Sequence, residues 1–205
     1  LPEMDFSRPA SADPAKLLAA ANKWRVTQSF ASPAVWDRLS AHCAATGGTM
    51  PTLREVFSCG APVPAEIIRR TLGCVAPEAK LHTPYGATES LPVSTIEGTE
   101  ILSGTDLGTT AGKGVCVGRR VTSIDWRVIG ITDTPIATMA DARELLPGEI
   151  GELVVRGPQV SRRYLTSPWM TSDPNALSKI SDGERVWHRM GDVGYCDAEG
   201  RFWYC

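Results

Sequence analysis

The sequence has 205 residues, of which 42% are hydrophobic and 21% are charged, a balance that supports a buried core and excludes a disordered or fibrous chain. With 21 Lys and Arg against 23 Asp and Glu, the net charge of -2 excludes a broad basic surface for nucleic acid. No apolar run approaches the roughly 20 residues of a membrane span, and the first residues lack a signal-peptide pattern, so we expect a cytoplasmic protein with neither a membrane span nor a nucleic-acid partner.

The first part of the chain alternates helical and strand signals. Asp13-Pro14 and Ser32-Pro33 each place a capping residue before a proline suited to the first helical turn. Helices are therefore expected from these two positions and over residues 64–72. Strands are expected over residues 26–30, 53–59 and 80–82. This alternation predicts an α/β fold built of parallel β-α-β units, with ligands bound at the loops that leave the strands, here residues 59–62 and 83–86.

The composition changes after Val93. Residues 94–118 are rich in Gly, Thr and Ser, which predicts a flexible connection. The β-branched runs at residues 124–131 and 152–156 are bounded by Pro and Gly, which predicts short strands of a mostly antiparallel sheet. The predicted organisation is an α/β subdomain over 1–93, a flexible connection over 94–118 and a small, mostly antiparallel β subdomain over 119–205.

The segment Tyr85-Gly86-Ala87-Thr88-Glu89 directly follows an expected buried strand. A glycine lets the backbone approach a ligand, a flat ring can stack on a base, a hydroxyl can bind a phosphate oxygen, and a carboxylate can hold Mg2+. Together these abilities describe a nucleotide site. The alternative is a turn in which Tyr85 packs in the core and Glu89 caps a helix, and the pentapeptide alone supports both interpretations.

A second signal is Asp192, which lies between Gly191 and Gly194 in an expected strand. A carboxylate held there can accept hydrogen bonds from both hydroxyls of a ribose. Asp also bonds its own backbone before many tight turns. Taken alone, this segment therefore fits a structural role as well.

In this order, the two segments resemble motifs of the adenylate-forming superfamily, which includes acyl-CoA synthetases, fatty acyl-AMP ligases and luciferases. The resemblance covers nearly the whole chain. Residues 53–62 resemble its adenine-lining strand and loop, 85–89 its Tyr-Gly-x-Thr-Glu motif, 148–153 its Gly-Glu-x-Gly-Glu-Leu stretch, and 187–194 its Trp-x-Arg-x-Gly-Asp-x-Gly motif.

This resemblance implies ATP and Mg2+ as cofactors and a role for each matching residue. In the family, the positions of Gly60, Ala61 and Pro62 line the adenine, and the tyrosine at position 85 stacks on it, flanked by Gly86 and Ala87. The catalytic positions are those of Thr88, which meets the α-phosphate, and Glu89, which holds Mg2+; Asp192 matches the carboxylate that binds the ribose.

Within the superfamily, residues 27–33, 82–93 and 187–195 are most similar to the β-lactone synthetases of bacterial long-chain olefin biosynthesis. The resemblance implies that ATP adenylates the carboxylate of a long-chain β-hydroxy fatty acid, whose β-hydroxyl then closes a β-lactone with release of AMP and pyrophosphate. Long-chain fatty acid-CoA ligase, fatty acyl-AMP ligase and a non-catalytic nucleotide-binding fragment are the alternatives.

Five further residues are candidates near the acyl group. Phe30, Leu91 and Val93 lie on segments that the family uses around its acyl pocket, with core packing as the alternative for each. His82 and, less favoured, His188 are candidate bases, although a single histidine at a strand end is usually structural.

The chain begins without Met and stops at Cys205, inside an expected strand. We therefore expect an internal fragment of the family's large N-terminal domain that is inactive alone. The partners that the resemblance implies are the N-terminal phosphate-loop segment and the C-terminal lysine-bearing domain of the same protein, a small-molecule acyl substrate, and other enzymes of the olefin pathway.

Overall fold

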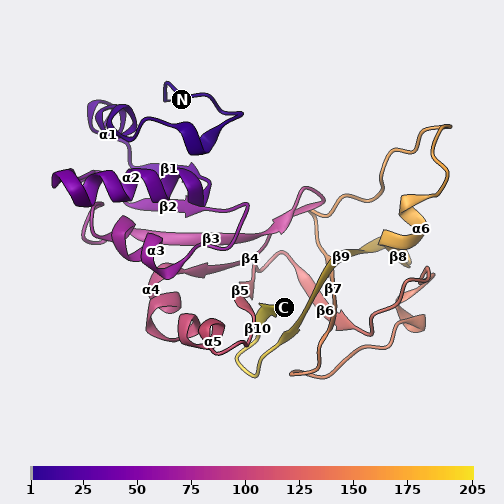
Figure 1. Ribbon diagram of the computed structural model, residues 1–205. Helices are drawn as coiled ribbons and strands as arrows, with labels where there is room; N and C mark the ends of the chain where they lie inside the picture. The colour runs from indigo at the N-terminus through magenta and orange to yellow at the C-terminus, as the bar shows by residue number, and fades with distance from the viewer. Residues whose placement is uncertain (1) are drawn as a thin grey trace. The chain divides into compact units, whose positions relative to one another are not determined.

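The computed structural model describes residues 2–205, and the chain divides into two compact units (Figure 1). Unit 1 comprises Leu1–Pro84 and Ile96–Leu107, and unit 2 comprises Tyr85–Thr95 and Gly108–Cys205. The chain passes from unit 1 to unit 2 within strand β3 (Lys80–Ala87) and returns within β4 (Ser90–Glu97). It crosses to unit 2 again within the short helix α5 (Asp106–Thr110), so all three passages occur within strands or a helix and not in loops.

Unit 1 is a parallel β-α-β layer. Its strands β1 (Gln28–Ala31), β2 (Glu55–Ser58) and β3 pair in parallel, with Phe30 opposite Phe57 and Phe57 opposite His82. The helices α1 (Pro14–Lys23), α2 (Pro33–Thr46) and α3 (Ala65–Leu72) lie along these strands (Figure 1). The core between them consists of buried apolar side chains, among them Trp36, Leu39, Met50, Leu53, Val56, Ile68 and Leu81.

The helix boundaries in unit 1 follow the local chemistry of the sequence. The Asp13 carboxylate accepts hydrogen bonds from the backbone N–H groups of Ala15 at 2.9 Å and Lys16 at 3.4 Å, which satisfies donors at the start of α1. Helix α2 begins at Pro33 and is followed by Gly47, whose φ of +72° ends it in the left-handed region that glycine tolerates.

Residues 94–118 differ from the predicted turn-rich connection. The structure has there the end of β4, three short helical stretches and the first part of β5. The helical stretches are α4 (Gly98–Glu100), a π-helical turn (Ile101–Thr105) and α5 (Asp106–Thr110). Ile101 and Leu102 pack against the core of unit 1, and this burial fixes a segment whose Gly, Thr and Ser content indicates turns.

Unit 2 is an antiparallel sheet. Its strands are β4, β5 (Val115–Arg120), β6 (Asp125–Ile129), β7 (Gly151–Arg156), β8 (Lys179–Asp182), β9 (Arg185–Cys196) and β10 (Arg201–Tyr204). The order runs β4-β5-β10-β9-β7-β6, with β8 added beside β9. The only α-helix of the described chain after β5 is α6 (Pro174–Ser178). The core contains Val93, Ile124, Leu153, Val155 and Phe202, and a second cluster contains Ile129, Val154, Ile180 and Trp187.

These two units confirm the predicted fold class, a parallel β-α-β layer followed by a mostly antiparallel β subdomain. None of the helices in residues 2–205 has the length and apolar character needed to cross a bilayer. All six cysteines are free thiols.

Candidate functional site

The segment Tyr85–Glu89 contains the end of β3 and the turn into β4, so the predicted loop at residues 83–86 is in fact strand. A Cβ atom at position 86 would lie 2.4 Å from the carbonyl oxygen of Ser90 and 2.9 Å from Cδ1 of Leu91. Glycine is therefore required at position 86 by the close approach of the returning chain. This packing explains Gly86 without a ligand.

The structure joins the two sequence signals through a single hydrogen bond in unit 2. The hydroxyl of Tyr85 donates to Oδ2 of Asp192, which lies 107 positions later in the chain. The Tyr85 ring lies beside Phe202, with 6.2 Å between the ring centroids. Burial, and then the bond to Asp192, raises the pKa of Tyr85 far above its ordinary value. Tyr85 is therefore a neutral donor that orients the Asp192 carboxylate.

Strand β9 presents Asp192 at an irregularity in its pairing with β7. The register shifts between Glu152 and Val154, and Gly191 has a φ of +73°, which an L side chain rarely adopts. A bulge of this kind bends a strand and changes the direction of its side chains. Asp192 follows this point and is half-buried.

The other end of the pentapeptide carries Thr88, which is exposed, and Glu89, which is half-buried. The hydroxyl of Tyr164 donates to Oε1 of Glu89 at 2.8 Å, and this bond is the main reason why the pKa of Glu89 lies below its ordinary value. Burial and the same bond raise the pKa of Tyr164 to about 12, so its hydroxyl keeps the proton it donates.

Glu89 lines a cavity of about 450 Å3 in unit 2, together with Tyr164, His188, Arg189 and Gly191. Sequence reasoning missed Tyr164. It lies 75 positions from Glu89, and no local pattern marks it.

The three predicted adenine-lining residues lie in unit 1, directly after β2. Gly60 has a φ of +96°, and a Cβ there would meet nothing within 4 Å, so its glycine is required by backbone conformation and not by crowding. Ala61 and Pro62 are exposed. Tyr85, Thr88, Glu89 and Asp192 belong to unit 2. A common nucleotide site of these residues stays a prediction.

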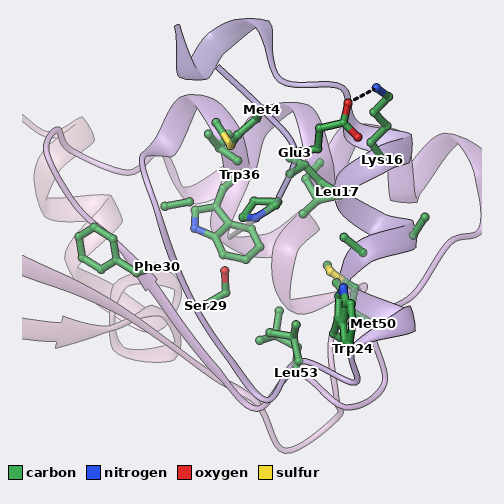
Figure 2. A pocket seen from close by; sticks show the side chains of 18 of the residues that line it. Glu3, Met4, Lys16, Leu17, Trp24, Ser29, Phe30, Trp36, Met50 and Leu53 are labelled. Atoms are coloured by element: carbon green, nitrogen blue, oxygen red, sulfur yellow. Dashed lines mark hydrogen bonds and ion pairs between the residues drawn. The ribbon is translucent and has the colours of Figure 1, made fainter. Parts of the chain in front are cut away.

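The three candidates for the acyl-pocket wall have different surroundings. Phe30 is 65% exposed and lines a cavity of about 1320 Å3 in unit 1, whose walls include Leu17, Trp36 and Leu53 (Figure 2). Leu91 is 47% exposed in unit 2. Val93 is completely buried in the core of unit 2, which favours the packing role left open for it.

Both candidate bases have structural partners. Nε2 of His82 lies 3.3 Å from Oε2 of Glu55, and the His82 ring stacks on Phe57. His188 is buried, and its Nδ1 lies 3.1 Å from the carbonyl oxygen of Ser178. Burial, and then the charge of Lys179, lowers the pKa of His188. These contacts favour the structural interpretation of both histidines.

The carboxylates of unit 2 fit Mg2+-bound ATP better than a metal held by protein alone. Within residues 2–205, no three His, Cys, Asp or Glu side chains are grouped to hold a metal. Mg2+ usually takes only one or two protein carboxylates and completes its shell with water and substrate phosphates. Glu89 fits this role, because Oε2 makes no bond to another side chain of the described chain. Asp192 retains acceptor positions for hydroxyl groups besides the one that Tyr85 uses.

The comparisons with known proteins agree on one family. The family described as AMP-binding enzyme matches residues 4–165. Olefin beta-lactone synthetases of Stenotrophomonas maltophilia and Xanthomonas campestris are each 44% identical over 206 residues, covering 100% of this chain and 36% of each relative. A feruloyl-CoA synthase of Amycolatopsis is 31% identical, covering 93% of this chain and 33% of that protein. The chain thus spans about a third of these relatives.

A solved structure shares the fold. A long-chain-fatty-acid-CoA ligase from Archaeoglobus fulgidus superposes with a TM-score of 0.71 at 23% identity, covering 94% of this chain and 36% of that one. The two units therefore follow a known arrangement of helices and strands.

Proposed function

Because this chain belongs to the family of AMP-binding enzymes, we propose that it is part of a longer, ATP-dependent and AMP-forming ligase. The full-length protein adenylates a long-chain β-hydroxy fatty acid and closes it to a β-lactone, releasing AMP and pyrophosphate. The observation that supports a nucleotide site is the hydrogen bond between Tyr85 and Asp192, with Glu89 in the same unit. The names and 44% identity of two relatives support the β-lactone product.

The candidate residues of unit 2 bind different parts of the nucleotide. Asp192 accepts hydrogen bonds from the ribose hydroxyls, and the Tyr85 hydroxyl holds its carboxylate in place. Glu89 remains ionised and binds Mg2+, which supplies charge that neutralises the phosphates. The exposed Thr88 meets the α-phosphate, and Gly60, Ala61 and Pro62 are the proposed adenine-lining residues.

The chemistry needs two successive substitutions. The fatty acid carboxylate attacks the α-phosphorus, and pyrophosphate leaves. The β-hydroxyl oxygen then attacks the acyl carbon, a C–O bond forms, AMP leaves with the electron pair of the broken bond, and the hydroxyl proton passes to water. An internal hydroxyl held near the acyl carbon has a high effective concentration, so no thiol is required. Phe30, which lines the cavity of unit 1, and Leu91, which is exposed in unit 2, are the proposed contacts of the acyl chain.

The chain spans 36% of the length of two of its relatives, and we propose that the whole activity requires the remaining parts. The phosphate-loop segment and the lysine-bearing domain of the full-length protein are its proposed partners, and the chain alone is proposed to be inactive. We further propose that the protein works in the cytoplasm, where other enzymes of olefin synthesis supply the β-hydroxy acid.

Product analysis tests this proposal. The full-length protein is incubated with ATP, Mg2+ and a long-chain β-hydroxy acid without CoA, and the products are identified by NMR. A β-lactone together with AMP is the expected result. If acyl-AMP accumulates, or if acyl-CoA forms only after CoA is added, the adenylating site is supported and the function is that of the ligase alternative. The 31% identity to a feruloyl-CoA synthase favours this alternative. Absence of any ATP turnover would favour a non-catalytic nucleotide-binding protein.

A further inference from the structure

Tyr164 is a half-buried residue between β7 and β8, directly before the exposed stretch of residues 165–173. Its neighbours Leu165 and Trp169 are 87% and 89% exposed, whereas Tyr164 is half-buried. Its backbone is held from both sides by Asn175 of α6. The Tyr164 N–H donates to Oδ1 of Asn175 at 2.7 Å, and Nδ2 of Asn175 donates to the Tyr164 carbonyl oxygen at 3.2 Å.

The ring of Tyr164 is also fixed by two neighbours. The ammonium of Lys179 lies 4.9 Å from the ring centroid, within the range of a cation–π contact. The His188 ring meets the Tyr164 ring edge-on, with 6.2 Å between centroids. The two backbone hydrogen bonds with Asn175 and the ring contacts together leave the hydroxyl of Tyr164 directed at Oε1 of Glu89.

Lys179 extends the same cluster to the backbone of Glu89. Its Nζ donates to the carbonyl oxygen of Ser161 at 2.7 Å and to Oγ of Ser161 at 3.1 Å. The Ser161 N–H in turn donates to the Glu89 carbonyl oxygen at 2.7 Å. The main chain and the side chain of Glu89 are thus both bound to the segment that follows β7.

We propose that Tyr164 is the positioning residue of Glu89, holding Oε1 so that Oε2 is presented to Mg2+ bound with ATP. This inference rests on the proposed metal role of Glu89. The contacts of Asn175, Lys179 and His188 serve to hold the tyrosine itself. Hydrogen-bond partners behind a metal ligand fix its orientation, and their removal commonly weakens metal binding.

A binding experiment separates positioning of the metal ligand from general support of the fold. The full-length protein is titrated with a non-hydrolysable ATP analogue, once as its Mn2+ complex, followed by electron paramagnetic resonance, and once without metal in EDTA, followed by calorimetry. Tyr164→Phe keeps the ring and removes the hydroxyl. It is expected to weaken binding of the Mn2+ complex roughly tenfold and to leave binding of the metal-free nucleotide unchanged.

Two further variants complete the test. Tyr195→Phe is the matched control, because the Tyr195 hydroxyl donates to the carbonyl oxygen of Lys113 and does not contact Glu89; both affinities should stay as in the unmodified protein. Glu89→Gln tests the metal role on which the inference rests. This variant should bind the Mn2+ complex no more tightly than the metal-free nucleotide.

The outcomes distinguish the two ideas. Suppose that Glu89→Gln no longer binds the Mn2+ complex more tightly than the metal-free nucleotide, whereas Tyr164→Phe still does. The positioning role of Tyr164 is then overturned, and the proposed function stands. If Glu89→Gln binds the Mn2+ complex normally, the metal role and the positioning role both fail. Equal losses of metal-bound and metal-free affinity in Tyr164→Phe would show a structural role only and would also overturn the inference.

Discussion

The ion pair between Arg189 and Glu152 is buried in unit 2, so removing only one of its partners is expected to destabilise the fold. The two side chains are only 9% and 8% exposed. Nε of Arg189 donates to both carboxylate oxygens, at 3.1 and 3.0 Å, and Nη2 donates to Oε2 at 2.6 Å. The remaining donors reach the carbonyl oxygens of Thr132, Thr134 and Leu177. Arg189 thus joins β9 to β7 and to two other segments of the chain.

Arg189→Met removes one partner and leaves the Glu152 carboxylate buried without its cation. Breaking a buried pair in this way costs about 3–5 kcal/mol. The double variant Glu152→Met/Arg189→Met buries no charge, so it should be less destabilised than Arg189→Met alone. Lys16→Met is the control, because its pair with Glu3 has side chains 57% and 85% exposed. A change of at most about 1 kcal/mol is expected there.

The assay is urea unfolding of the full-length protein, followed by tryptophan fluorescence, and the quantity compared is the free energy of unfolding. A loss below about 1 kcal/mol in Arg189→Met would match an exposed pair and would refute the reasoning. A double variant that is less stable than Arg189→Met would refute it as well. Replacing both partners by apolar residues would then not reduce the destabilisation caused by the unpaired Glu152 carboxylate.

Three further predictions concern binding, pH and activity. Asp192→Ala should weaken binding of a stable acyl-AMP mimic to the full-length protein by about 1.5–3 kcal/mol, measured by calorimetry; unchanged affinity would remove Asp192 from the ribose site. Because burial puts the pKa of His188 below its ordinary 6.5, the stability it contributes is complete above that pH and is lost as the pH falls toward the folded-state pKa. His188→Gln should therefore flatten the fall in unfolding free energy between about pH 7 and pH 5, and an equally steep fall would contradict this. The 205-residue chain alone should not turn over ATP with any fatty acid, and release of pyrophosphate would disprove its inactivity.

Local signals in the sequence predicted much of unit 1. The Asp13-Pro14 pair marks a helix start because its carboxylate and its fixed φ act within a few residues. The alternation of strands and helices likewise predicts parallel pairing. The helical stretches at Gly98–Thr110 were missed, because their conformation depends on burial of Ile101 and Leu102 and not on their own turn-forming composition.

The candidate site was predicted in part. Tyr85, Glu89 and Asp192 belong to recognisable segments, but their hydrogen-bond partners do not follow from those segments. Tyr164 and Glu89 are 75 positions apart, and Arg189 and Glu152 are 37 apart. Such pairs depend on which strands become neighbours, which a single sequence does not specify. The strand conformation at residues 83–86 was missed because Pro84 and Gly86 are usual signals of a loop.

The hydrogen bond from Tyr85 to Asp192 also restricts which amino acids can replace each other at these positions. Any aromatic ring at position 85 could stack on a flat base, but only tyrosine also supplies the hydroxyl that Asp192 accepts. Among homologous sequences, loss of the carboxylate at position 192 should therefore be accompanied by a relaxed choice of ring at position 85. Where the carboxylate is retained, phenylalanine and tryptophan should be rare at position 85, so that the two positions covary although most of the chain lies between them.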